Sequence, residues 1–199
     1  MTSALVVVLL LAALAMFHTA LVSSLLALGF TDAAETLSIN DPDVAEAQAN
    51  RYRTLAVQLD AQEEALDSPN TPVLTSKHAF STSLMYWQQA ISLRPSWPYY
   101  HLGALDVEVF LRDKTAIQQR IKHIIQLAPN ERGLDKGFLV LAVLVWDWVA
   151  PEEKEWLLTR MGELNHSTLK YVFSYAKQAD NHYDVCTNLP WKKVRGLCR

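Results

Sequence analysis

Residues 86–95 (YWQQAISLRP) and 120–129 (RIKHIIQLAP) are built alike, and this likeness indicates how the chain folds. Each segment reads as a helix that ends in the pattern apolar-x-Leu-x-Pro. The two closing prolines lie 34 positions apart, since 129 − 95 = 34. A repeat of this period is typical of stacked helix pairs. In this register the matching positions are Trp87 with Ile121, Ala90 with Ile124, and Leu93 with Leu127.

The stretch between the two helix ends supports the same interpretation. Tyr99, Leu102 and Gly103 resemble the W-x-x-L-G start of the first helix of a tetratricopeptide repeat. Ile117 and Ile124 stand where that repeat prefers alanine, so an unrelated helical bundle with two similar helix ends is the alternative. No segment alternates convincingly with period two. We therefore expect an all-α soluble domain of the tetratricopeptide-like helical-repeat type.

The N-terminal segment is strongly apolar and is expected to form one transmembrane helix. Residues 4–30 carry no charged side chain, and a helix needs about 20 apolar residues to cross the hydrocarbon core. A cleaved signal peptide is the alternative. Its basic n-region is missing from Met1, Thr2 and Ser3, and no clean A-x-A site precedes the acidic segment that follows.

Charge divides the rest of the chain. Residues 31–69 carry nine acidic side chains against Arg51 and Arg53, a balance of −7, which leaves +4 for the remainder of a chain whose net charge is −3. A balance so close to zero gives no reason to expect nucleic acid as a partner. We expect three regions: a transmembrane anchor (1–30), an acidic helical spacer (31–72) and a helical-repeat domain with a C-terminal disulfide loop (73–199).

A helix is expected to begin in the acidic region, with Asp41 as its cap and Pro42 at its first position. Residues 69–72 (PNTP) should end it. This helix is either a spacer or interaction arm, or a solvated helix packed along the domain. Its moderately apolar face consists of Val44, Ala45, Ala49, Tyr52, Ala56 and Leu59.

The C-terminal half reads as three more helices. Residues 137–150 (GFLVLAVLVWDWVA) are too short to span a bilayer comfortably and predict a buried core helix, with Asp147 facing solvent or a basic partner. Pro151 starts the next helix, and Ser167 is expected to cap the last one. The apolar positions of the last helix are Leu169, Val172, Phe173 and Ala176.

Cys186 and Cys198 are the only cysteines, and they close a short loop near the C-terminus. We expect a disulfide, which an oxidising compartment permits and which would stabilise the fold by roughly 3 kcal/mol. A metal site would need further ligands, and a redox-active pair would favour C-x-x-C spacing. The disulfide and the acidic flank favour export of the soluble part.

No pattern indicates catalysis. The six histidines form no H-x-x-x-H or H-E-x-x-H pair, and no serine lies in a G-x-S-x-G or S-x-x-K setting. We therefore expect no enzyme activity, no catalytic residue, no metal site and no cofactor.

Exposed aromatic residues are the better indication of a functional surface. The turn 94–100 (RPSWPYY) joins two helices, and we select Arg94, Trp97, Tyr99 and Tyr100 as a contact surface for a partner or a glycan. Packing in the core is the ordinary role of such rings. Trp191 lies in a basic tail that could hold an anionic partner or lipid head groups, although a solvated face explains the tail as well.

The order of these features resembles a known family. An N-terminal anchor, the stretch AISLRPSWPYYHLGAL, a second helix ending in LAP and a closing CTNLPW…C resemble the VpsP-type proteins of exopolysaccharide biosynthesis loci in Gram-negative bacteria. The stretch LRPSWPYYHLGAL is also similar to the periplasmic helical tail of some O-antigen-ligase-like polymerases. The likeness covers residues 85–199 and lacks the multi-span polymerase portion, so glycosyl transfer is not carried over.

The resemblance implies a single-pass protein of the bacterial inner membrane whose soluble domain lies in the periplasm. It would act as an accessory scaffold for exopolysaccharide biosynthesis or export. Its expected partners are an inner-membrane polysaccharide polymerase, copolymerase or export component, with polysaccharide contact as a further expectation. A glycan-binding protein that uses the aromatic turn, and an assembly factor of a pilus or secretion system, are the alternatives.

Overall fold

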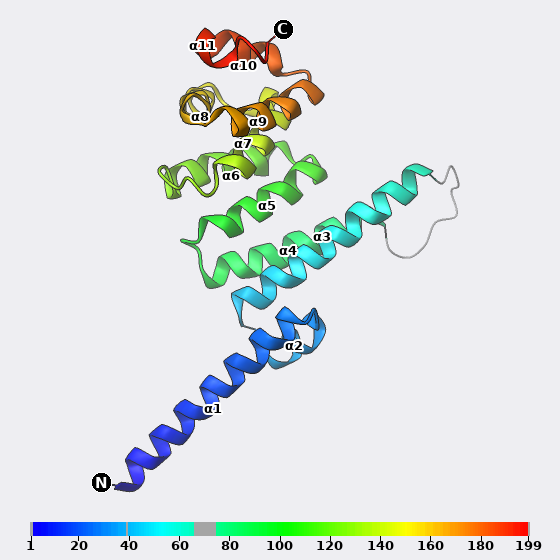
Figure 1. Cartoon of the computed structure of the whole chain (residues 1–199). Helices are drawn as coiled ribbons and strands as arrows, with labels where there is room; N and C mark the ends of the chain where they lie inside the picture. Colours follow the sequence, from blue (N-terminus) through cyan, green and yellow to red (C-terminus); the bar gives the residue numbers. More distant parts are fainter. Residues whose placement is uncertain (1, 39, 66–74, 199) are drawn as a thin grey trace. The chain divides into compact units, whose positions relative to one another are not determined.

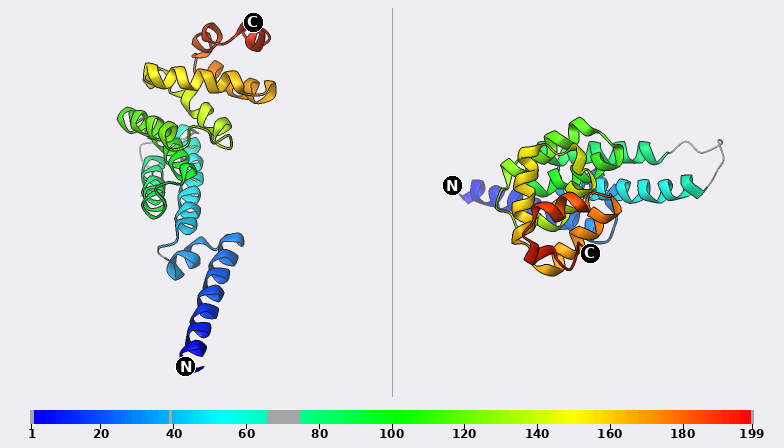
Figure 2. Two further views of the ribbon diagram at one scale, coloured as in Figure 1. Left: turned by 90° about the vertical axis from the view of Figure 1, so that its left-hand side faces the viewer. Right: turned by 90° about the horizontal axis from the view of Figure 1, so that it is seen from above.

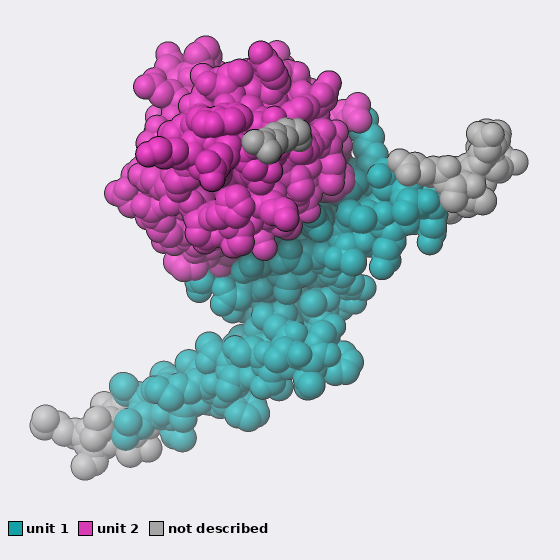
Figure 3. All heavy atoms as spheres, turned by 45° about the horizontal axis from the view of Figure 1, so that its top comes forward, with its two compact units in different colours: residues 1–94 teal, residues 95–199 magenta. Residues whose placement is uncertain are grey.

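The computed structural model describes residues 2–38, 40–65 and 75–198, and every regular element within these ranges is a helix. This confirms the predicted all-α fold class. The chain divides into two compact units, which we call unit 1 (residues 1–94) and unit 2 (residues 95–199), shown in teal and magenta in Figure 3.

The described residues of unit 1 form four helices (Figure 1): α1 (Thr2–Ala27), α2 (Thr31–Leu37), α3 (Pro42–Ala65) and α4 (Ser76–Leu93). Unit 2 contains seven helices and one 3-10 turn: α5 (Pro98–Leu111), α6 (Lys114–Leu127), α7 (Asp135–Leu144), η1 (Trp146–Trp148), α8 (Pro151–Glu163), α9 (His166–Gln178), α10 (His182–Asn188) and α11 (Trp191–Val194).

α1 is the one helix, among those described, that is long and apolar enough to cross a membrane, and the qualifying segment is Val7–Ala27. Its large apolar side chains from Val7 to Phe17 are exposed. The predicted apolar N-terminal helix is therefore present as one continuous element. A membrane anchor and a signal sequence share these properties.

α3 pairs with α4, as expected from the second of the two alternatives, a helix packed along the domain, and not from the first, a spacer or interaction arm. The two helices lie side by side in both views of Figure 2. Small residues of α3 make the close approach possible: Ala49 and Ala56 are buried, and the Ser83 hydroxyl of α4 donates to the Ala49 carbonyl at 2.7 Å. The predicted boundary at residue 72 is thus replaced by one at residues 94 and 95. The predicted helix end at 69–72 lies outside the described residues.

The start of α3 is as predicted. Asp41 Oδ1 accepts a hydrogen bond from the Asp43 amide at 2.8 Å, and Pro42 is the first helical residue. Tyr52 of the predicted apolar face stacks on Tyr86 of α4, with ring centroids 5.7 Å apart. The face identified in the sequence is therefore the one that α4 covers.

The two repeat-like helix ends have the same local geometry. Arg94 and Ala128 follow α4 and α6, and their dihedral angles are φ −137°, ψ 74° and φ −138°, ψ 56°. Each amide donates to the carbonyl four residues earlier. The matched core positions are buried in both helices: Trp87 and Ile121, and Ala90 and Ile124. α5 and α6 form the predicted helix pair, joined by the two residues Arg112 and Asp113.

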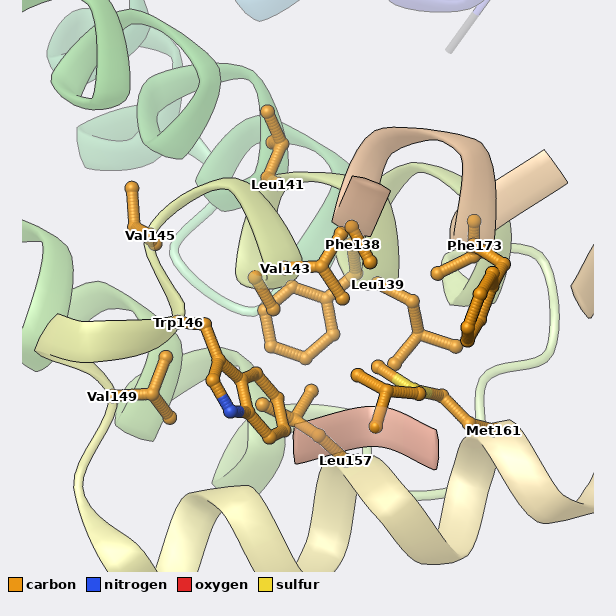
Figure 4. Packing of buried hydrophobic residues seen from close by; sticks show 14 of the residues in the cluster. Phe138, Leu139, Leu141, Val143, Val145, Trp146, Val149, Leu157, Met161 and Phe173 are labelled. Carbon is orange, nitrogen blue, oxygen red and sulfur yellow. The ribbon is translucent and has the colours of Figure 1, made fainter. Parts of the chain in front are cut away.

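The core of unit 2 is built around α7 (Figure 4). Phe138, Leu139 and Val143 of α7 point towards Leu157 and Met161 of α8, and all five side chains are buried. The predicted apolar positions of α9 join the same cluster: Leu169, Val172, Phe173 and Ala176.

Two details of the C-terminal half differ from the sequence analysis. The helix predicted at 137–150 ends at Leu144, and the short turn η1 follows it. Asp147 of this turn faces solvent, which was one of the two expected alternatives. The cap of α9 is Asn165, whose side chain accepts from the Thr168 amide, and Ser167 donates to that same Asn165 oxygen. Asn165 is the cap because it directly precedes the first helical residue.

Candidate interaction site

The predicted aromatic turn presents Trp97 to solvent at the start of unit 2. Pro98 occupies the first position of α5, which fixes the backbone just after Trp97. The Trp97 side chain is 47% exposed, and its ring packs beside Tyr99 with centroids 5.3 Å apart. The indole is therefore exposed and supported on one side.

Tyr99 supports Trp97 from within the fold. Its hydroxyl donates to Glu131 Oε1 at 3.2 Å, and the Gly133 amide donates to the same oxygen at 2.9 Å. Burial and this hydrogen bond raise the pKa of Tyr99, so the phenol stays a donor. A Cβ at position 133 would lie 2.2 Å from the Tyr99 hydroxyl, so the glycine makes room for it.

The predicted contact surface included Tyr100 and Arg94. It is wrong for Tyr100, and Arg94 is engaged by a residue of unit 1. Tyr100 is 1% exposed because it lies on the buried face of α5 with Ala104 and Val107, so it cannot form a contact surface. Arg94 belongs to unit 1, where its Nη1 lies 3.0 Å from Asp43 Oδ1 of α3. The surface of the turn in unit 2 is thus carried by Trp97, with Tyr99 beneath it.

A buried polar cluster holds the turn in place. His101 Nε2 donates to the Pro95 carbonyl at 2.9 Å, and His101 Nδ1 accepts from Arg120 Nη1 at 3.2 Å. This assignment requires the neutral ring with its proton on Nε2. Burial of the ring lowers the pKa of His101, and the nearby His123 and Arg120 lower it further. The lowered pKa favours the neutral ring.

Arg120 completes this cluster. Its Nη2 lies 2.7 Å from Glu108 Oε1, and its Nε lies within 3.3 Å of both Glu108 oxygens. Glu108 is buried, so its charge is balanced by a forked guanidinium contact. The chain Glu108–Arg120–His101 therefore connects α5 and α6 to the backbone of the exposed turn.

Unit 2 also contains a cleft of about 620 Å³ between α8 and α10. One wall is the α8 face that carries Lys154 and Leu158, and the other includes Asp184 and Asn188 of α10. Asp184 Oδ2 accepts from the indole of the buried Trp146 at 3.3 Å. This mixture of apolar and polar side chains is typical of ligand-binding clefts.

The disulfide lies close to this cleft in sequence. Cys186 and Cys198 are bonded, with Cα atoms 6.0 Å apart, as predicted. The bond joins α10 to the end of the chain. Trp191, at the start of α11, is 61% exposed and is therefore available for contact. Lys193 of the basic tail instead donates to the Leu164 carbonyl at the end of α8.

Sequence reasoning missed the cluster below the turn and the cleft. Glu108 and Arg120 carry opposite charges on consecutive helices, which is a usable signal once the two-residue connection is known. His101 follows the selected turn by one residue. The cleft residues give no comparable signal, because α8 and α10 are far apart in sequence.

Across the described part of the chain, no three His, Cys, Asp or Glu side chains gather as metal ligands would. The fold and the site define an all-helical protein with one helix able to cross a membrane and an exposed, supported tryptophan on its second unit. Comparisons of the chain with protein-family models, with curated proteins and with solved structures found no match.

Proposed function

We propose that this chain is a single-pass accessory protein that docks onto another protein of the bacterial cell envelope through the Trp97 turn. The observation that carries the proposal is the state of Trp97: a large exposed ring whose position is fixed by Tyr99 and by the His101–Pro95 bond. Exposed, preorganised tryptophans often carry much of the energy of protein interfaces. Such a residue binds with little loss of conformational freedom.

The setting of this docking rests on other features. α1 supplies a helix suited to anchoring in the inner membrane, and the Cys186–Cys198 bond fits an oxidising compartment such as the periplasm. The assignment to exopolysaccharide biosynthesis or export rests on the resemblance to VpsP-type proteins. On that basis the partner is a polysaccharide polymerase, copolymerase or export component.

Site-specific photocrosslinking in living cells tests the proposal. A photoreactive residue at the exposed Ser96 should yield a discrete adduct, and adding Trp97→Ala should abolish it. In the matched control the photoreactive residue replaces Tyr183, an exposed aromatic residue outside the turn. Mass spectrometry of the adduct identifies the partner. A pilus or secretion component would remove the polysaccharide assignment, and an adduct unchanged by Trp97→Ala would remove the docking role of the turn.

Glycan binding is the second candidate, because an exposed indole ring is also suited to stacking on a sugar. The purified protein should then bind purified exopolysaccharide, and Trp97→Ala should lose that binding while Tyr183→Ala keeps it. Circular dichroism checks that both variants remain folded. Docking predicts no Trp97-dependent binding of polysaccharide by the isolated protein.

A further inference from the structure

α1 is longer than a bilayer requires. Its 26 residues extend about 39 Å at 1.5 Å per residue, whereas the hydrocarbon core is about 30 Å thick. About six residues therefore lie beyond the hydrocarbon. The rest of unit 1 shows which end of the helix projects.

Among the described residues, protein packs against α1 only near its C-terminal end. Val22 is buried in a small cluster with Ala34 of α2 and Val44 of α3, whereas the large side chains from Val7 to Phe17 are exposed. Polar residues occur at both ends of α1, with Thr2 and Ser3 at the first and His18, Thr19, Ser23 and Ser24 at the end that protein covers, so the packing decides between the two ends. The projecting end is the C-terminal one.

α2 runs back along this projecting end. Gly29, with φ +80°, ends α1 in a left-handed turn in which the Phe30 amide donates to the Leu25 carbonyl at 2.8 Å. At the other end of α2, His18 Nε2 donates to the Leu37 carbonyl at 3.0 Å. α2 thus extends from the end of α1 to the level of His18.

The two sides of α2 differ in chemistry. Towards α3, Asp32 forms an ion pair with Arg51. Glu35 accepts from Gln48 Nε2 at 2.6 Å and from the Tyr86 hydroxyl at 2.8 Å. On the other side Phe30, Ala33 and Leu37 are exposed and follow one another at three- and four-residue steps. The carboxylates are satisfied by protein, and an apolar edge is left uncovered.

We propose that α2 stands in the headgroup layer of the membrane, beside the end of α1, with Leu37 at the hydrocarbon boundary and Phe30 towards water. This rests on the proposed anchoring by α1. α2 packs against the membrane-spanning helix itself, through Ala34 on Val22 and through the His18–Leu37 bond, so lipid is the occupant of its exposed edge. The seven-residue α2 extends about 10 Å at 1.5 Å per residue, so it spans a headgroup layer of about 5–8 Å and reaches the edge of the hydrocarbon.

The hydrogen bond from His18 to the Leu37 carbonyl stabilises α2 in this position. Leu37 is the last residue of α2, so its carbonyl has no partner within the helix. An unpaired carbonyl is costly where water is scarce. His18 supplies the missing donor from α1, which allows the end of α2 to lie at the hydrocarbon boundary.

Depth-resolved fluorescence quenching on the full-length protein in phosphatidylglycerol–phosphatidylcholine vesicles tests the proposal. Because Cys186 and Cys198 are bonded, a single introduced cysteine takes the environment-sensitive label. The labelled variants are Leu37→Cys and Phe30→Cys, with Leu14→Cys as the deep reference and Ser81→Cys of α4 as the aqueous reference. Quenchers are headgroup nitroxide lipid, mid-chain nitroxide lipid and aqueous iodide.

We expect the Leu37→Cys label to be quenched severalfold more by headgroup nitroxide than by mid-chain nitroxide, and the Phe30→Cys label to respond to headgroup nitroxide and partly to iodide. Adding His18→Ala should make the Leu37→Cys label severalfold more accessible to iodide, and His18→Gln should largely restore protection. If both α2 labels behave like Ser81→Cys while Leu14→Cys stays protected, the anchor holds and this inference fails. Labels shielded from all quenchers would show a protein cover instead, and iodide access at Leu14→Cys would overturn the anchor itself.

Discussion

Asp135 and Arg160 form the most deeply buried ion pair among the described residues. Arg160 Nη2 and Nε lie 2.6 and 2.9 Å from Asp135 Oδ1. Asp135 belongs to α7 and Arg160 to α8, and both side chains are buried. The guanidinium also lies 5.5 Å from the centre of the Trp156 ring. Two charges removed from water in this way stabilise the fold only while both are present.

Replacing Arg160 by Met should therefore lower the free energy of unfolding by about 3–5 kcal/mol, because the buried Asp135 would keep only the exposed Arg132, 3.9 Å away, as a counter-charge. Urea denaturation of the detergent-solubilised protein, followed by circular dichroism, measures the loss. Arg132→Ala is the matched control. Arg132 lies at the surface, 2.9 Å from Glu163 and 3.9 Å from the same Asp135, so its loss tests an exposed partner of that carboxylate and should cost less than about 1 kcal/mol. Equal effects of the two substitutions would contradict the assignment.

His101 makes the stability depend on pH. Its pKa is lowered in the folded protein by burial and by the adjacent His123 and Arg120, so the unfolded chain binds a proton first, near its usual pKa of about 6.5. The contribution of the neutral ring is present above that pH and is lost as the pH falls through the lowered pKa. Stability should thus decline from pH 7.5 to pH 5.

The variant His101→Gln keeps a donor for the Pro95 carbonyl but does not titrate. Its urea midpoint should therefore change less between pH 7.5 and pH 5 than that of the parent protein. Measurements at four pH values in one buffer series provide the comparison. The same slope in both proteins would show that His101 does not control the pH response.

At the scale of helices, periodicity and capping chemistry predicted most elements. The apolar positions of α9 and the Asp41–Pro42 start of α3 were readable because each depends on neighbours within a few residues. The end of α7 was not, since Val145 and Trp146 are as apolar as the residues before them and the turn η1 depends on tertiary packing. Packing of α3 along the domain was one of two expectations, but its partner α4 could not be named, because an alanine-rich face gives a weak apolar signal.

The contact surface was predictable only where it depends on neighbours within a few residues. Trp97 stands between two prolines, which exclude a regular helix and favour exposure of the ring. Tyr100 follows only three residues later, yet α5 has already begun and turns that ring towards the core. The cluster of Glu108, Arg120 and His101 requires knowledge of how α5 and α6 pack, which no single helix contains.

The disulfide is expected to hold α10 and α11 in place. By the loop-closure model, closing 12 residues stabilises the fold by roughly 3 kcal/mol. Replacing both Cys186 and Cys198 by Ser should therefore increase amide hydrogen exchange across α10 and α11 while α7 stays protected. Reductant should have the same effect on the parent protein and none on the double variant. Unchanged exchange at α10 would contradict a stabilising role.

For the molecule as a whole, the main prediction concerns retention and orientation of α1. The mature protein should retain α1, because no clear cleavage site precedes the acidic segment that follows it. Intact-mass spectrometry of the membrane fraction measures this, and loss of the first 25–30 residues would identify a signal peptide instead. A C-terminal alkaline phosphatase fusion should be active if unit 2 is exported.

The way α2 is fastened has a mechanical consequence. Only residues 28–30 separate α1 from α2, and α2 is tied at one end to His18 and along its side to Gln48, Arg51 and Tyr86. These ties leave no slack between the anchor and the α3–α4 pair. If α1 spans a membrane, a change in its tilt, whether from bilayer thickness or from a lateral pull, should therefore rotate α3 and α4 with it.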